Sequence, residues 1–219
     1  MFFVAEKSVT GNANTHLNQR THQNEQFGMM MRVQNILFKI KTMEEKKFEI
    51  GIYLIGSLRN QEVPKLARRL REVLEVEVFD DWFSPGPNAD DFWRDYEHVR
   101  GSSYKQALRS FAATHVYEFD KYHIDRLPIV VMVMPAGKSG HLELGYKLGK
   151  GDLGYIFFDE EPERWDVMYQ FATDLFFNED ELVAQLEKAI AQLKKEHPNW
   201  TTNHRKPERV EKTEKILMG

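Results

Sequence analysis

The sequence predicts an α/β fold in which a parallel sheet of roughly five strands is flanked by helices, giving three layers. Short apolar runs alternate with segments of helical periodicity, which is the order expected when helices connect parallel strands. The run at residues 128–134 is apolar throughout and rich in β-branched residues, as the buried central strand of a parallel sheet should be. Together these patterns favour one α/β domain over a helical bundle or an all-β sandwich.

The elements follow in a regular order. The first strand is predicted over residues 48–55, because its apolar run ends at Gly56, and residues 63–74 carry apolar side chains on one helical face. Further strands are expected at residues 76–79, 128–134, 155–158 and 175–177. Helical periodicity recurs at residues 104–122, 161–171 and 181–195. The segment between the second strand and the helix at 104–122 is interpreted as a long insertion.

Composition excludes several classes of protein. The chain has 219 residues and no cysteine, which removes disulfide scaffolds, thiolate zinc sites and cysteine nucleophiles. Its longest uncharged apolar run, residues 127–136, is about half of the roughly 20 residues that span a bilayer. We therefore expect a soluble, cytoplasmic protein without membrane contact. His115 and His123 lack paired ligand spacing, so neither a metal site nor a cofactor is expected.

The charge of −4 is unevenly distributed. Residues 1–42 carry a net charge of +3 and residues 198–219 carry +2, so the segment between them is strongly acidic. This balance argues against a domain that binds nucleic acid. We expect a disordered or weakly ordered extension at residues 1–45, the folded domain at 46–197 and a basic polar tail at 198–219.

The turn after the first strand contains Gly56, Ser57 and Arg59. Ligands of open parallel sheets bind beyond the carboxyl ends of the strands, so this turn is a candidate site. Glycine permits a tight turn, free backbone amides at a helix start attract anions, and the arginine adds a planar fork of donors. A phosphate site and an ordinary turn with a surface arginine explain these residues equally well.

The loop after the third strand contains Ser139, Gly140, His141 and Glu143. It does not match a nucleoside-triphosphate loop, because Met132 stands where the first glycine of that motif is required. Ser139 is predicted to cap a helix whose first or second turn holds Glu143. The positive end of the helix favours an ionised glutamate, which suits a nucleophile. A purely stabilising role for this glutamate remains the alternative.

Residues 118–146, together with residues 52–59, resemble the nucleoside 2-deoxyribosyltransferase family, which includes the deoxynucleoside 5′-monophosphate N-glycosidases. The resemblance covers roughly residues 49–172, and its most specific part is Glu-Leu-Gly-Tyr at 143–146. It implies a three-layer flavodoxin-like or Rossmann-like domain with Glu143 as nucleophile, Tyr53 on the first strand and Asp120 as the acid that serves the base. It also implies a 5′-phosphate site at Gly56, Ser57, Arg59 and Ser139, and subunits paired into a homo-oligomer.

One position departs from the family pattern. A second aspartate often precedes the third strand, but Pro128 stands there and Asp125 lies three residues earlier. Two readings follow: Asp125 substitutes from a shifted backbone, or one acid role is missing.

Further candidates follow the second strand. Trp82 could stack on a base, and Asp80 or Asp81 could accept hydrogen bonds from a base or sugar, although aromatic residues in such an insertion more often serve packing. Gly140 and His141 lie shortly before the predicted nucleophile in the sequence and are predicted to contact the substrate, with a structural role for His141 as the alternative.

These residue types fit retaining cleavage of an N-glycosidic bond in a nucleoside or nucleoside 5′-monophosphate, since a carboxylate can trap the sugar while a second acid assists the leaving base. Transfer to another base and hydrolysis differ only in the final acceptor. Two alternatives remain: an NAD-type glycohydrolase, and a non-catalytic nucleotide-binding or sensor module.

Overall fold

The computed structural model describes residues 47–204. The predicted extension at residues 1–45 and the part of the predicted tail beyond residue 204 lie outside the described residues.

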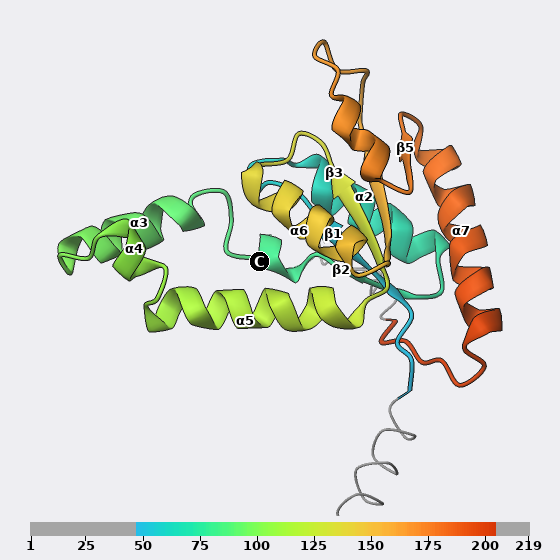
Figure 1. The fold of residues 1–219 in the computed structure, drawn as a ribbon, viewed down its shortest axis with the longest axis horizontal. Coiled ribbons are helices and arrows are strands. Elements are labelled where there is room, and N and C mark those ends of the chain that lie inside the picture. Colours follow the sequence, from blue (N-terminus) through green and yellow to red (C-terminus); the bar gives the residue numbers. More distant parts are fainter. Residues whose placement is uncertain (1–46, 205–219) are drawn as a thin grey trace, which may run out of the picture. The chain divides into compact units, whose positions relative to one another are not determined.

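The core of the domain is a parallel sheet of five strands in the order β2-β1-β3-β4-β5 (Figure 1). The strands are β1 (Gly51–Ile55), β2 (Glu77–Phe79), β3 (Ile129–Val133), β4 (Leu153–Phe157) and β5 (Asp174–Phe176). The chain runs outward from β1 to β2, then returns past β1 to β3 and continues outward on the other side. The predicted fold class is confirmed, and this order puts the topological switch point, where ligands of such sheets bind, between β1 and β3.

Helices cover both faces of the sheet. Alternate residues of β1 point to opposite faces, so Ile52 and Leu54 belong to one apolar cluster and Tyr53 and Ile55 to the other. The first cluster includes residues of α2 (Glu62–Val73) and α7 (Glu179–Glu196), and the second includes residues of α5 (Phe111–Arg126) and α6 (Lys138–Gly149). The side chain of Tyr53 therefore faces the layer formed by α5 and α6.

The prediction of one continuous helix over residues 104–122 is wrong. The structure has α4 (Tyr104–Ala107) and a separate α5 that begins at Phe111. Ser110 starts the second helix, because its backbone is extended and its Oγ accepts a hydrogen bond from the amide of Ala113 at 3.3 Å. The insertion before it contains the 3₁₀ turn η1 (Asp81–Phe83) and the helix α3 (Ala89–Val99).

The prediction of a helix over residues 161–171 is also wrong. Only a 3₁₀ turn, η2 (Val167–Phe171), forms there. Trp165, Val167 and Phe171 are exposed, so the apolar face that the periodicity predicted is not buried and tertiary packing does not stabilise an α-helix.

The chain after residue 197 packs along the sheet instead of leaving it at once. The backbone of Thr201 accepts a hydrogen bond from the amide of Ile50 and donates one to the carbonyl of Phe48, both at 2.8 Å. The hydroxyl of Thr202 accepts a hydrogen bond from the amide of Glu77 in β2, also at 2.8 Å. The predicted boundary at 197 therefore lies within chain that contacts the domain.

Candidate active site

A cavity of about 290 Å³ lies between α5 and α6, next to β1. The predicted catalytic residues Tyr53, Asp120 and Glu143 all line it. The remaining lining residues are Tyr117, Lys121, Ile124, Leu142 and Tyr146. The structure thus brings together three side chains that are far apart in the sequence and come from β1, α5 and α6.

Close packing at the start of α6 positions Glu143. The helix begins at Lys138, so Glu143 lies in its second turn, as predicted. A Cβ atom added to Gly140 would lie 3.0 Å from Cγ2 of Ile55 and 3.3 Å from Cβ of Ala136. The absence of a side chain at Gly140 therefore lets the first turn of α6 approach the end of β1, which holds Glu143 beside Asp120 and Tyr53.

The two carboxyl groups of the cavity are hard to ionise. Burial, followed by the negative charge of Asp120, raises the pKa of Glu143 to about 7. Burial raises the pKa of Asp120 to about 6, and its Oδ1 has no hydrogen-bond partner among the described residues. Burial, followed by the charges of Glu143 and Asp120, raises the pKa of Tyr53, so its phenol stays protonated. Both carboxyl groups therefore hold a proton more tightly than an exposed acid does, and Glu143 more tightly than Asp120.

This result differs from the expectation that the helix start keeps Glu143 ionised. Glu143 lies in the second turn, where the helix dipole has weakened, and it points into a cavity whose lining is mostly apolar. Desolvation therefore outweighs the favourable field of the helix.

The two turns proposed to hold a phosphate are tied together by Asn60, a buried residue that sequence reasoning missed. Its Nδ2 donates to the carbonyls of Val133 and Pro135, both at 3.4 Å, and its Oδ1 accepts from the amide of Glu62 at 3.0 Å. The turn at residues 56–60 and the loop after β3 are thus neighbours. Nothing in the sequence marks Asn60, because a polar amide is common in any strand-to-helix turn.

Within these turns, the predicted helix start at Gly56 and the predicted cap at Ser139 both differ from the structure. The turn containing Gly56 and Ser57 does not open α2, which begins only at Glu62. The hydroxyl of Ser57 accepts a hydrogen bond from the amide of Arg59 at 3.2 Å. Ser139 is exposed and lies inside α6, whose N-cap residue is Gly137, so the predicted cap is wrong.

Two other predicted residues lie outside the cavity lining. The Nδ1 of His141 contacts the carbonyl of Gly137 at 2.9 Å and its Nε2 contacts the hydroxyl of Tyr169 at 3.1 Å, which directs the ring toward η2. Asp125 is held by ion pairs with Lys121 and Lys150 and by a hydrogen bond from the hydroxyl of Tyr146.

Burial alone would raise the pKa of Asp125, but hydrogen bonds from Lys121, Lys150 and Tyr146 lower it overall. Asp125 is therefore ionised and committed to this cluster beside the cavity. In this position Asp125 does not act as the second acid of the family pattern, whose place in the sequence is taken by Pro128.

The residues after β2 serve mainly packing. Trp82 donates from Nε1 to the carbonyl of Leu54 at 2.7 Å and packs against both apolar clusters. Asp80 forms an ion pair with Arg71 of α2, and Asp81 is an exposed residue at the start of η1. None of these three side chains lines the cavity between α5 and α6.

Within residues 47–204, no group of three or more His, Asp or Glu side chains is arranged to hold a metal ion. Over the same range, no helix combines the length and apolar character needed to cross a membrane.

The fold and the cavity define a Rossmann-like α/β domain with a pair of protonatable carboxyl groups on the α5 and α6 side of its sheet. No family model matches the chain, and none of the curated proteins matches it. A solved structure of a 2-deoxyribosyltransferase from the psychrotolerant bacterium Bacillus psychrosaccharolyticus is similar, with 20% sequence identity and a TM-score of 0.41. The alignment covers 62% of this chain and 95% of that chain.

Proposed function

We propose that this chain cleaves the N-glycosidic bond of a nucleoside or nucleoside 5′-monophosphate, with a deoxynucleoside as the favoured substrate, and transfers the sugar to another base or to water. The observation that carries the proposal is the carboxyl pair Glu143 and Asp120, which shares one cavity with Tyr53 and has raised pKa values. The sequence resemblance to the nucleoside 2-deoxyribosyltransferases supports the same chemistry.

The proposed reaction proceeds in two displacements. The carboxylate of Glu143 attacks C1′ while the bond from C1′ to the base nitrogen breaks, and Asp120 donates its proton to the departing base. A second base or a water molecule then attacks C1′, gives its proton to Asp120 and releases Glu143. Two inversions at C1′ give overall retention.

A nucleophile must be ionised while the acid is protonated, whereas burial holds a proton more tightly on Glu143 than on Asp120. The proposed roles therefore require the proton to lie on Asp120 once the substrate is bound. The phenol of Tyr53 stays protonated and lines the same cavity as both carboxyl groups, so it can donate a hydrogen bond to the attacking carboxylate. Tyr53 is therefore proposed as a positioning residue for Glu143.

A 5′-phosphate would bind at the turns that Asn60 joins. The turn at residues 56–59 supplies backbone amides and Arg59, and the start of α6 adds free amides and the hydroxyl of Ser139. The domain as a whole is acidic, so these local donors must attract the phosphate.

The test is a panel of nucleosides, nucleoside 5′-monophosphates and NAD, incubated with and without an added acceptor base and analysed by chromatography. We expect free base from at least one deoxynucleoside or its monophosphate, and its loss in Glu143→Gln. Glu118→Gln is the matched control, because Glu118 is exposed on α5 and does not line the cavity.

Each other outcome contradicts the proposal in a distinct way. Wild-type turnover by Glu143→Gln removes Glu143 as nucleophile. Release of nicotinamide alone identifies an NAD-type glycohydrolase, and calorimetric binding of a nucleotide without base release under any acceptor condition identifies a binding module.

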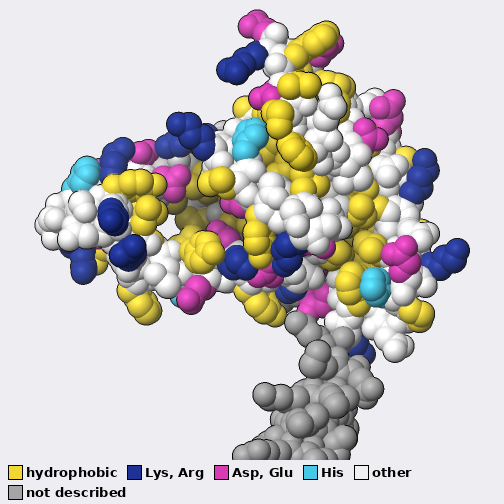
Figure 2. All heavy atoms as spheres, in the orientation of Figure 1, with side chains coloured by type: hydrophobic (Ala, Val, Ile, Leu, Met, Phe, Trp, Pro, Cys, Tyr) yellow, Lys and Arg dark blue, Asp and Glu magenta, His cyan; other side chains and the backbone are white. Residues whose placement is uncertain are grey.

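We also propose that the chain forms a homo-oligomer through α5 and the helices before it. Only Ile124 of α5 is buried, whereas Phe111 is 88% exposed and Tyr117 and Tyr122 are each 63% exposed. Figure 2 shows further apolar side chains on the surface of this part of the molecule. A helix that is apolar on most sides is normally covered, and a second copy of the chain is the proposed cover.

A further inference from the structure

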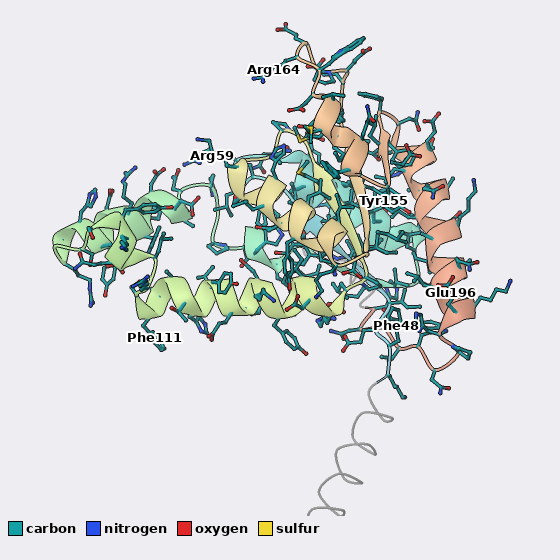
Figure 3. The ribbon with its side chains drawn as sticks, viewed as in Figure 1. Phe48, Arg59, Phe111, Tyr155, Arg164 and Glu196 are labelled. Atoms are coloured by element: carbon teal, nitrogen blue, oxygen red, sulfur yellow. The ribbon has the colours of Figure 1, made fainter. Side chains whose placement is uncertain are left out.

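Arg59 does not stand alone at the edge of the candidate phosphate site. Its NH2 group donates to Oδ2 of Asp91 in α3 at 2.9 Å, and the NH1 group of Arg94 donates to Oδ1 of the same carboxylate at 3.0 Å. The carboxylate of Asp91 thus lies between two guanidinium groups. One comes from the turn after β1 and the other from α3. Figure 3 shows Arg59 extending from the body of the domain on the side of α3.

We propose that Arg94 is the second cationic group of the phosphate site, and that a phosphate of the substrate takes the place of the Asp91 carboxylate between Arg59 and Arg94. This inference rests on the proposed nucleotide substrate. It adds to the phosphate site a residue on α3, a helix within the insertion that the sequence resemblance did not use.

Geometry supports the exchange. Arg59 belongs to the turn that offers backbone amides to a phosphate, and its guanidinium already shares one anionic group with Arg94. A phosphate held by Arg59 is therefore within reach of Arg94. Guanidinium forks bind phosphate oxygens in pairs, and a phosphate dianion carries more charge and more acceptor oxygens than a carboxylate.

Solvent exposure makes the exchange easy. The side chains of Arg59, Asp91 and Arg94 are 57%, 40% and 55% exposed. Ion pairs this exposed contribute little to stability, so giving up the Asp91 contacts costs little. Arg94 also pairs with Asp95 through its NH2 group at 2.9 Å, and this second contact can persist while NH1 moves to a phosphate.

The direct test is calorimetric titration of the full chain with ribose 5-phosphate and with inorganic phosphate at low ionic strength. We expect Arg94→Gln to weaken binding of ribose 5-phosphate about tenfold, which corresponds to about 1.4 kcal/mol. We expect Asp91→Asn to tighten binding several-fold, because the internal competitor is removed while the helix keeps its length and shape.

Matched controls separate local contact from overall charge. Arg100→Gln removes the same charge at the end of α3, and Asp90→Asn removes a carboxylate that forms no ion pair with Arg59 or Arg94 among the described residues. Both controls should stay within about twofold of the wild type. Equal effects of Arg94→Gln and Arg100→Gln, or of Asp91→Asn and Asp90→Asn, would overturn the proposal. Unfolding curves show whether each variant folds.

Kinetics distinguish this inference from the proposed function. If the chain releases base, Arg94→Gln should raise KM for the nucleoside 5′-monophosphate and leave the reaction of the corresponding nucleoside unchanged. If base release depends on Glu143 but Arg94→Gln binds phosphate as tightly as the wild type, the role of Arg94 is refuted and the proposed function stands. Phosphate binding that depends on Arg94 without any base release would refute the enzyme and retain the anion site.

Discussion

The burial of Glu143 lowers the stability of the folded protein at pH values at which its carboxyl group ionises. Its pKa rises from 4.5 to about 7, so the folded state resists ionisation more than the unfolded state does. Well below pH 4.5 the carboxyl group of Glu143 is protonated in both the folded and the unfolded state, so it does not change the free energy of unfolding. As the pH rises through 7, the penalty reaches its full size, and the protein is less stable at pH 8 than it would be without this charge.

The first prediction follows from this sign. Glu143→Gln should raise the free energy of unfolding by about 3 kcal/mol at pH 8 and leave it nearly unchanged at pH 4.5. Denaturant unfolding of both proteins at the two pH values measures the difference. Glu118→Gln, at an exposed position on α5, should give no such pH dependence. A gain that is equal at both pH values would contradict the buried, ionisable state of Glu143.

The sequence could indicate some of these residues and not others. Glu143, Asp120 and Tyr53 were predicted through their resemblance to a family motif, and the structure brings them into one cavity. Tyr117 and Lys121 also line that cavity, but which side of α5 faces α6 depends on packing that no local pattern encodes. Asn60 is equally unmarked, because its importance comes from two loops that meet only in the folded chain.

At the scale of elements, strands were easier to predict than helices. All five strands overlap the apolar runs that predicted them. The signal is clearest for β1 and β3, which are buried at every position and therefore apolar on both faces. The break between α4 and α5 was missed, since Ser110 interrupts an apolar periodicity that continues on both sides. The segment before η2 has the period of a helix but no surface against which to pack.

The second prediction concerns two glycines of α6. A Cβ at Gly145 would meet nothing within 4 Å, whereas a Cβ at Gly140 would press on Ile55 and Ala136. Gly145→Ala should therefore raise the free energy of unfolding by about 0.5–1 kcal/mol through helix propensity. Gly140→Ala should lower it by about 1 kcal/mol or more, because the gain in propensity is outweighed by overpacking.

Urea unfolding of the two alanine variants provides the measurement, and each variant is the other's control for backbone entropy. If both substitutions shifted stability in the same direction by the same amount, the close approach of α6 to β1 would be refuted.

At the scale of the whole molecule, the exposed apolar residues of α5 lead to the third prediction. The wild-type chain should sediment as an oligomer at micromolar concentration, and Phe111→Asp should shift it toward monomer by placing a charge at the centre of the proposed contact. Val167→Asp is a suitable comparison, since Val167 is also an exposed apolar residue but lies on η2. A wild-type monomer at every concentration tested would contradict the proposed contact.

The chain after α7 also has a consequence for β2, which is the outermost strand on its side of the sheet. Unpaired backbone groups of such a strand can recruit a strand from another molecule and start aggregation. Here the guanidinium of Arg71 donates to the carbonyl of Val78, and the ring of His204, which follows α7, contacts the carbonyl of Val76. Polar side chains of the protein itself thus block this edge against foreign strands.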